Sequence, residues 1–431
     1  MLFALALVLA EMRDLFDVLD SSPEMERATS VGGYMDSVLT NITVVELSQS
    51  PAAGLAAMVM ADFGAEVVWF EYATDTVQGR DDYRVWHRGK TRVPVELDGD
   101  AAGSQADILR HHIVASADVF LTDLSSQSLQ ELGLDWATLR QSRPDLIHAE
   151  VSAFGDDNPY SGLAAHAAHA AHGAQGMPDE SLVAAAIGRM MIFEGLAQRQ
   201  GPAYPGVRVG THGAAQATLA GVLAQLVART KGRLGQRQQA TILQALIAYD
   251  LVGLGASQLE TSPLPEMNPM ELMPMLNFQP VQCADGRWLQ LGNLLPHLQV
   301  NFLQAAGLTD ILDDPRFAEQ PLEEAVAEEF RERVCAHMAT RSLDEWMTVF
   351  VADGGVAAHP YQSTQDAMWD ADIVANGHSD DRHGFRQLGV LGQFSATPGQ
   401  VAAPPRTQSL QDLVLPEKFT AAVDAPADSE R

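Results

Sequence analysis

Two adjacent carboxylates, Asp179 and Glu180, stand at the start of an almost wholly apolar stretch that runs to Phe193. The segment MPDESLVAAAIGRMMIF from residue 177 predicts a buried helix, with an Asp N-cap candidate and acids in its first turn. A carboxylate at the mouth of such a helix is either a cap or a reactive group. Once desolvated, a carboxylate is a competent nucleophile toward an activated acyl group. The local pattern alone favours the cap.

A second group of chemically capable side chains is basic. Five cations fall within thirteen residues of an otherwise acidic chain: Arg80, Arg84, Arg88, Lys90 and Arg92. Such an island could hold an anionic group such as a phosphate. The alternative is a solvated loop whose arginines pair with neighbouring acids, and charge alone does not separate the two.

The elements that must position these groups begin with residues 43–71. The β-branched run 43–47 predicts a buried strand, residues 52–63 predict a helix, and 66–71 predict a second strand. The turn Ser48 to Pro51 supplies cap chemistry and a proline that suits the first helical turn. In parallel sheets, ligands sit beyond the carboxyl ends of strands, at helix N-termini, which places a candidate site at 48–53. The alternative is a β-α-β unit with no ligand at this turn.

A histidine run, LAAHAAHAAHG from 163 to 173, repeats His166, His169 and His172 every three residues. The first two could share a metal as neighbours on a helix. No carboxylate or cysteine stands near enough to complete a site before Asp179. A low-complexity surface insertion is the favoured interpretation, and we expect no metal.

Composition excludes several classes of function. The 431 residues carry a formal charge of −29, which argues against nucleic-acid binding because that needs a basic footprint. The ten apolar residues at the start are too short to span a bilayer and lack a basic flank, so no membrane role is expected. Only Cys283 and Cys335 occur, far apart, and a reducing cytoplasm is the default location.

Strands alternate with helices from residue 43 to 155, which predicts a doubly wound α/β domain. Residues 275–291 predict a β-hairpin that turns at 284–286, and residues 296–350 predict helices of a smaller α+β domain. We expect five parts: an N-terminal extension (1–40), a large domain (41–250), a small domain with its crossover (251–360), a return segment (361–415) and an acidic tail (416–431).

Several motifs, taken in order, resemble class III CoA-transferases, the carnitine/bile-acid type of acyl-CoA transferases. The resemblance runs from about residue 41 to 415. It rests on the segments 45–48 (VELS), 61–68 (ADFGAEVV), 87–92 (HRGKTR), 152–155 (SAFG), 232–236 (GRLGQ) and 283–288 (CADGRW). No single motif is specific, whereas the ordered set is.

The resemblance implies a Rossmann-like large domain, a small domain and an interlocked homodimer. It also implies that coenzyme A is moved from an acyl-CoA donor to a carboxylic acid through a covalent intermediate on an aspartate. When the histidine run is treated as an insertion, Glu180 takes the position of that aspartate and Asp179 the position before it. The same resemblance places Gln49, Ser50, Pro51 and Ala52 at the CoA-facing wall, and Arg88 and Lys90 near the CoA phosphates.

The chain departs from the family pattern around the cofactor. The family has an Asn, an aromatic residue and an Arg in the stretch that here reads DLSSQ, from Asp123 to Gln127, and this sequence has none of the three. By their place in this stretch, Asp123 and Leu124 are expected at the cofactor. Tyr72 replaces a common basic residue. Two alternatives therefore stay open beside an active transferase. One is a non-catalytic or partner-dependent homologue that binds CoA. The other is an α-methylacyl-CoA racemase, which requires a His-Asp pair as its bases. His166 matches only the histidine of that pair.

Overall fold

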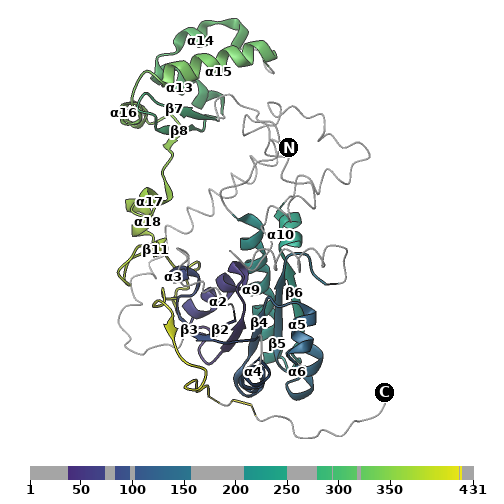
Figure 1. The fold of residues 1–431 in the computed structure, drawn as a ribbon. Coiled ribbons are helices and arrows are strands. Elements are labelled where there is room, and N and C mark those ends of the chain that lie inside the picture. The colour runs from purple at the N-terminus through teal and green to yellow at the C-terminus, as the bar shows by residue number, and fades with distance from the viewer. Residues whose placement is uncertain are drawn as a thin grey trace, which may run out of the picture.

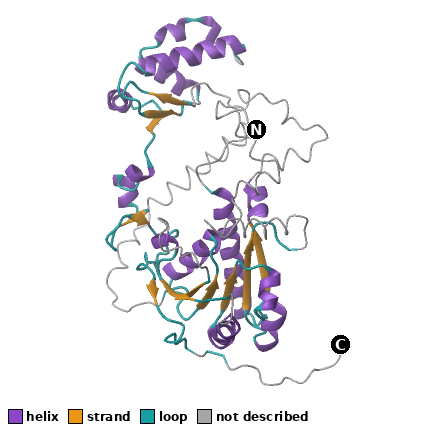
Figure 2. Cartoon of the chain, in the orientation of Figure 1, coloured by secondary structure: helices purple, strands orange, loops and turns teal. Residues whose placement is uncertain are grey.

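A seven-stranded parallel sheet forms the centre of the large domain (Figures 1 and 2). The computed structural model describes residues 37–72, 83–97, 102–156, 208–249, 279–293, 295–317, 322–416 and 418–419. The strand order β12-β3-β2-β1-β4-β5-β6 contains the 3-2-1-4-5-6 order of doubly wound sheets. The α/β class expected from the sequence is confirmed. The strands are β1 (Thr43–Leu47), β2 (Glu66–Glu71), β3 (Lys90–Pro94), β4 (Val119–Thr122), β5 (Ile147–Ser152), β6 (Arg237–Thr241) and β12 (Arg406–Thr407).

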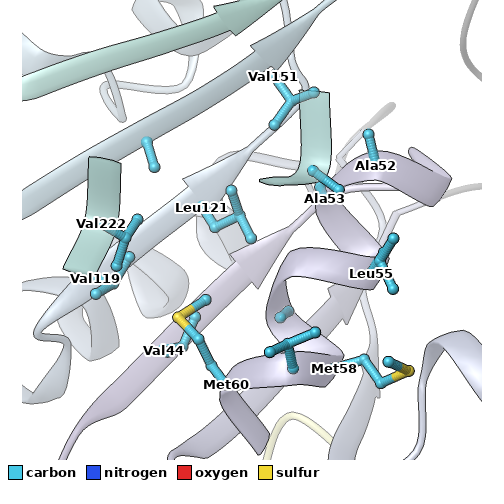
Figure 3. Packing of buried hydrophobic residues seen from close by; sticks show 14 of the residues in the cluster. Val44, Ala52, Ala53, Leu55, Met58, Met60, Val119, Leu121, Val151 and Val222 are labelled. Atoms are coloured by element: carbon cyan, nitrogen blue, oxygen red, sulfur yellow. The ribbon is translucent and has the colours of Figure 1, made fainter. Parts of the chain in front are cut away.

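Helices cover both faces of this sheet, so its central strands are apolar on both sides. In β1, Val44 packs into one hydrophobic cluster and the next residue, Val45, into the other. The first cluster, shown in Figure 3, lies under α2 (Pro51–Asp62), α9 (Val209–Thr230) and α10 (Ile242–Tyr249). The second lies under α4 (Ala102–Ser116), α5 (Ser126–Glu131) and α6 (Trp136–Ser142). A one-turn helix, α3 (Tyr83–Trp86), precedes β3.

The β1-α2-β2 unit forms as its sequence predicts. Ser50 caps α2 by accepting the backbone N–H of Ala52, and Pro51 is the first helical residue. Gly64 ends the unit's turn with φ of +95°, a conformation that glycine adopts without the steric penalty of a Cβ atom. The carboxyl end of β1 therefore leads directly into the N-terminus of α2.

Helix α9 is strongly apolar but is not buried on all sides. Its inner face packs on the sheet, whereas Leu223 and Val227 on the outer face are 38% and 54% exposed. Gly213 on the inner face lets Tyr249 of α10 approach closely, since a Cβ there would meet its ring at 2.4 Å. The apolar residues of α9 therefore lie on two faces, one packed against the protein and one exposed.

The smaller α+β unit lies apart from the large sheet (Figure 1). Strands β7 (Pro280–Gln282) and β8 (Trp288–Leu291) form the expected hairpin, and β9 (Ala358–Pro360) extends it as an antiparallel sheet. One hydrophobic cluster joins this sheet to its helices. These are α13 (Pro296–Ala306), α14 (Thr309–Asp313), the 3-10 turn η4 (Pro315–Phe317), α15 (Glu324–Met338) and α16 (Leu343–Asp353).

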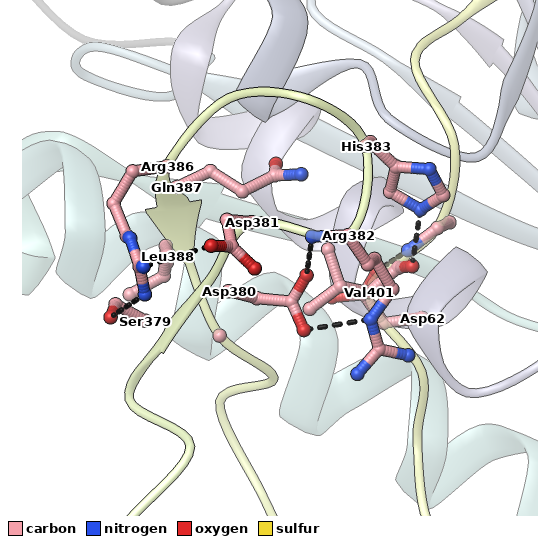
Figure 4. A network of polar contacts seen from close by, with 12 residues as sticks. Asp62, Ser379, Asp380, Asp381, Arg382, His383, Arg386, Gln387, Leu388 and Val401 are labelled. Atoms are coloured by element: carbon pink, nitrogen blue, oxygen red, sulfur yellow. Dashed lines mark hydrogen bonds and ion pairs between the residues drawn. The ribbon is translucent and has the colours of Figure 1, made fainter. Parts of the chain in front are cut away.

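The chain then returns to the large sheet through a segment that we call the strap, residues 361–416. It contains α17 (Thr364–Ala367), α18 (Ala371–Ala375), the small hairpin β10 (Ser379–Asp380) and β11 (Gln387–Leu388), and β12, which pairs with β3. Figure 4 shows the polar contacts of the hairpin beside Asp62 of α2. Three buried leucines, Leu410, Leu413 and Leu415, anchor its end.

A buried ion pair fastens the strap. The guanidinium of Arg88 donates to both carboxylate oxygens of Asp62, at 3.1 and 2.5 Å, and to the backbone carbonyls of Leu388 and Gly389. Both side chains are almost fully excluded from solvent. Asp62 also accepts the N–H of Ala402. Arg88 and Asp62 together thus join α2 to two points of the strap.

We predict that Gly235→Ala destabilises the fold by about 3 kcal/mol, because the new Cβ would stand 1.9 Å from the backbone oxygen of Leu146. The control is Gly103→Ala in α4, where a Cβ meets no atom within 4 Å. That variant should be unchanged or up to about 1 kcal/mol more stable. Urea unfolding measures both, and equal effects of the two substitutions would contradict the prediction.

We also predict that Arg88→Met costs about 3–5 kcal/mol in the free energy of unfolding, because it leaves the Asp62 carboxylate buried without its counter-charge. The double variant Arg88→Met, Asp62→Leu should lose less than the sum of the two single variants. A urea double-mutant cycle tests this coupling, and strictly additive losses would show that the pair does not act as a unit.

Candidate functional site

Three chain segments meet at the carboxyl edge of the sheet. The turn at residues 48–52 follows β1, Tyr72 follows β2, and Asp123 follows β4. Because β1 lies between β2 and β4, the ends of these three parallel strands are neighbours. This is the place where doubly wound sheets bind ligands, since the strand order reverses there.

The carboxylate of Asp123 joins the three segments. Its Oδ2 atom accepts the backbone N–H groups of Gln49 and Ser50 at 2.9 and 2.7 Å, and its Oδ1 atom accepts the Tyr72 hydroxyl at 3.0 Å. Burial raises the pKa of Asp123 to about 6, and the nearby charge of Glu46 adds to this, while the three donors oppose it. Burial and the Asp123 charge together raise the pKa of Tyr72 well above its usual value.

The turn predicted to face the cofactor has its backbone donors engaged within the protein. Gln49 and Ser50 donate to Asp123, Ala52 donates to the Ser50 hydroxyl oxygen at 3.1 Å, and Pro51 has no N–H. The turn therefore has a fixed shape before any ligand arrives.

One donor at this turn lacks a partner among the described residues. The side-chain Nε2 atom of Gln49 is buried and makes no hydrogen bond there. A buried amide N–H without an acceptor is unfavourable by about 1–3 kcal/mol, so such a group marks a place where a ligand oxygen would be stabilised. The Gln49 amide is thus a donor that any acceptor oxygen, a carbonyl oxygen included, would satisfy.

A buried ion pair supports the turn from below. Lys90 Nζ donates to Glu46 Oε2 at 2.7 Å and to the backbone oxygen of Gly54 in α2 at 3.0 Å. The Ser48 hydroxyl donates to the other oxygen of Glu46 at 2.8 Å. Burial lowers the pKa of Lys90, and the Glu46 carboxylate opposes this shift. The pair connects β3, β1 and α2 directly beneath the candidate site.

Two aromatic rings complete this support. His87 stacks on Trp69 with ring centroids 3.7 Å apart, and the Trp69 indole N–H donates to the backbone oxygen of Ser48 at 2.7 Å. The His87 Nδ1 atom lies 3.3 Å from Lys90 Nζ. The position of Ser48 is therefore held from β2 as well as from β1.

Three of the four described cations of the basic island form buried ion pairs, and the fourth, the exposed Arg84, lies over the ring of Phe385 at 5.0 Å. Arg88 pairs with Asp62, Lys90 with Glu46 and Arg92 with Glu71, and each of these pairs is buried. The role predicted for Arg88 and Lys90 at the CoA phosphates stays a prediction, and contact with a phosphate would require opening a buried ion pair. Arg80 lies outside the described residues.

Leu124, also predicted at the cofactor, packs against the second hydrophobic cluster. Its backbone N–H donates to the Thr122 hydroxyl oxygen at 3.2 Å. The structure therefore brings Asp123 to the turn, whereas the side chain of its neighbour contributes to the core.

Asp179, Glu180 and the three histidines of the run lie outside the described residues, so their predicted roles stay predictions. Within the described part of the chain, no group of three His, Cys, Asp or Glu side chains could hold a metal ion. No described helix is long and apolar enough to cross a membrane.

Sequence reasoning missed the contacts that shape the site. The hydrogen bond from Tyr72 to Asp123 joins positions 51 residues apart, and no local sequence pattern predicts it. The sequence did contain one signal for the buried ion pair beneath the turn. Glu46 is the only charge in the strand TVVEL, and a buried carboxylate requires a partner.

Curated relatives resemble the chain over most of its length. A succinyl-CoA–D-citramalate CoA-transferase of Chloroflexus aurantiacus is 24% identical over 383 residues, which span 84% of this chain and 89% of the relative. An (R)-2-hydroxy-4-methylpentanoate CoA-transferase of Clostridioides difficile is 25% identical over 361 residues, which span 79% of this chain and 83% of that protein.

A solved structure agrees in fold. The crystal structure of a CAIB/BAIF family protein from Brucella suis superposes with a TM-score of 0.65 at 19% identity, covering 86% of this chain and 97% of that one. The model of CoA-transferase family III matches residues 39–408, which include the whole large sheet, the smaller unit and most of the strap. The chain therefore belongs to CoA-transferase family III.

Proposed function

We propose that the protein is an acyl-CoA transferase that moves CoA from an acyl-CoA donor to a carboxylic acid. Family membership supports the reaction class. The observation that carries the site is the Gln49 side-chain amide at the carboxyl edge of the sheet, which has no hydrogen-bond partner among the described residues and is suited to a thioester carbonyl oxygen. Coenzyme A enters as part of the substrate and supplies the thioester whose acyl carbon is attacked.

We assign the nucleophile to Glu180, with Asp179 as the second candidate. The carboxylate attacks the thioester carbonyl and expels the thiolate, which gives a mixed anhydride on the protein. The expelled CoA thiolate then attacks the protein-side carbonyl of this anhydride, which forms a protein-CoA thioester and releases the first acid as a carboxylate. The acceptor carboxylate attacks that thioester and expels the thiolate, and the thiolate then attacks the acceptor's carbonyl in the new anhydride to form the product thioester. The side chain returns as a free carboxylate, so no atom is consumed.

The described residues would act on the oxygen that becomes negative in these steps. Gln49 would donate its amide N–H to that oxygen, while Asp123 and Lys90 act through the turn, which they hold from above and below. A donor fixed before the reaction stabilises developing charge without reorganisation. Tyr72 contributes by fixing the Asp123 carboxylate.

We expect the purified protein to exchange CoA between a donor such as succinyl-CoA and a panel of free acids, as new thioesters separated by chromatography would show. Glu180→Ala with Asp179→Ala should abolish exchange, and hydroxylamine should trap the acylated carboxylate in the parent protein only. Gln49→Ala should lower kcat by about 100-fold to 1,000-fold. Full activity in the double variant would refute the assignment, and Asp107→Ala on the exposed face of α4 is the control.

A second candidate is a non-catalytic or partner-dependent homologue that binds CoA. It is favoured by the engagement of Arg88 and Lys90 in buried ion pairs. This candidate predicts CoA binding without exchange, or activity only with a second chain. A racemase is the third candidate, and it alone would introduce solvent deuterium at the α-carbon of an acyl-CoA.

We further propose that two copies assemble as an interlocked homodimer. Exposed apolar side chains on α9, Leu223 and Val227, are consistent with a surface that a second copy covers. Light scattering after size-exclusion chromatography should give twice the 46.4 kDa of one chain at every concentration tested. A stable monomer would exclude an interlocked arrangement, because interlocked chains separate only when they unfold.

We place the protein in the cytoplasm as a further proposal. It rests on the two cysteines, Cys283 and Cys335, which are both free. A secreted protein of this size with two free thiols would be unusual.

A further inference from the structure

The N-terminus of α2 already holds an anion, which the protein itself supplies. In doubly wound sheets, the helix after the first strand commonly receives a phosphate, because its first N–H groups lack partners and its dipole favours negative charge. Here the Asp123 carboxylate accepts the N–H of Ser50, the N-cap residue, and the N–H of Gln49 just before it.

The next two residues of the turn offer a second anion no free backbone donor. Pro51 has no N–H, and the N–H of Ala52 is bound by the Ser50 hydroxyl oxygen. An incoming phosphate would therefore have to displace Asp123 before it could accept the hydrogen bonds of Gln49 and Ser50.

The charges near the turn make such displacement unfavourable. The partners of the Asp123 carboxylate are two amides and the Tyr72 hydroxyl, so among the described residues no cation neutralises it. Lys90, the cation beneath the turn, is paired with Glu46. A phosphate or carboxylate placed here would lie against an uncompensated negative charge.

We propose that Asp123 is a specificity-determining residue, a built-in anion that keeps phosphate and carboxylate groups off the α2 N-terminus, so that the 48–52 turn accepts an uncharged part of the ligand. The inference rests on the proposed function for the identity of that ligand. CoA carries phosphates at one end and an uncharged arm with amide groups at the other. The turn with its Gln49 amide then faces the uncharged arm and the thioester, and the phosphates bind elsewhere.

The exclusion of anions from the 48–52 turn should depend on pH. Burial raises the pKa of Asp123 to about 6, and the groups that face it are Tyr72 and Glu46. Because the neutral acid dominates below that pKa, the repulsion is present above about pH 6 and is lost as the pH falls through it. Since the Tyr72 hydroxyl lowers the pKa of Asp123, its removal should shift the transition to higher pH.

Sulfate is a suitable probe, because its charge is constant across this pH range and it takes no part in acyl transfer. We expect calorimetric titration of the full chain at about pH 7.5 to show sulfate binding to Asp123→Asn at least about tenfold tighter than to the parent protein. Glu131→Gln, which removes one exposed negative charge at the end of α5, should bind sulfate as the parent does.

The pH series separates a charge effect from a structural one. The parent protein should gain sulfate affinity between about pH 7.5 and about pH 5.5, Asp123→Asn should show no such transition, and Tyr72→Phe should show it at higher pH. Equal sulfate affinity of Asp123→Asn and the parent at pH 7.5 would overturn the proposal. If Asp123→Asn does not fold, the pH series of the parent protein and of Tyr72→Phe test the proposal instead. In that case, a sulfate affinity of the parent protein that does not change with pH would overturn the proposal. None of these sulfate titrations uses acyl-CoA, so their result does not depend on whether the protein shows transferase activity.

Discussion

Three buried ion pairs hold the segment around β3 to the rest of the large sheet. Arg88, Lys90 and Arg92 reach Asp62 in α2, Glu46 in β1 and Glu71 in β2. A buried charge without its partner is strongly destabilising, so each pair constrains where its two elements can lie. The strap adds to this arrangement because Arg88 also binds its backbone carbonyls.

The candidate site depends on this support. Lys90 and Glu46 lie beneath Ser48, and Asp123 closes the turn from the neighbouring strand β4. The N-terminus of α2 is thereby shaped and charged before a ligand binds. A preformed turn suits a reaction in which charge develops on an oxygen, because donors that are already oriented need no reorganisation. The same closure explains why the turn should favour an uncharged part of CoA.

Much of the fold could be predicted from local pattern. The run TVVEL, the cap at Ser50 and the glycine at 64 each specify their structure through short-range chemistry, and the β1-α2-β2 unit follows them. The basic island showed the limit of such reasoning. A cluster of cations in sequence can bind a ligand or pair internally, and only the placement of Asp62, Glu46 and Glu71 distinguishes these outcomes.

The sequence by itself determined the family, the parallel α/β class and the position of the turn between β1 and α2, because periodicity, caps and ordered motifs are local or collinear features. Tertiary structure alone decided that Asp123 meets Gln49 and Tyr72, and that Arg88 binds the strap some 300 residues away. Those contacts arise from strand order and chain return, which bring together side chains that no spacing in the sequence relates.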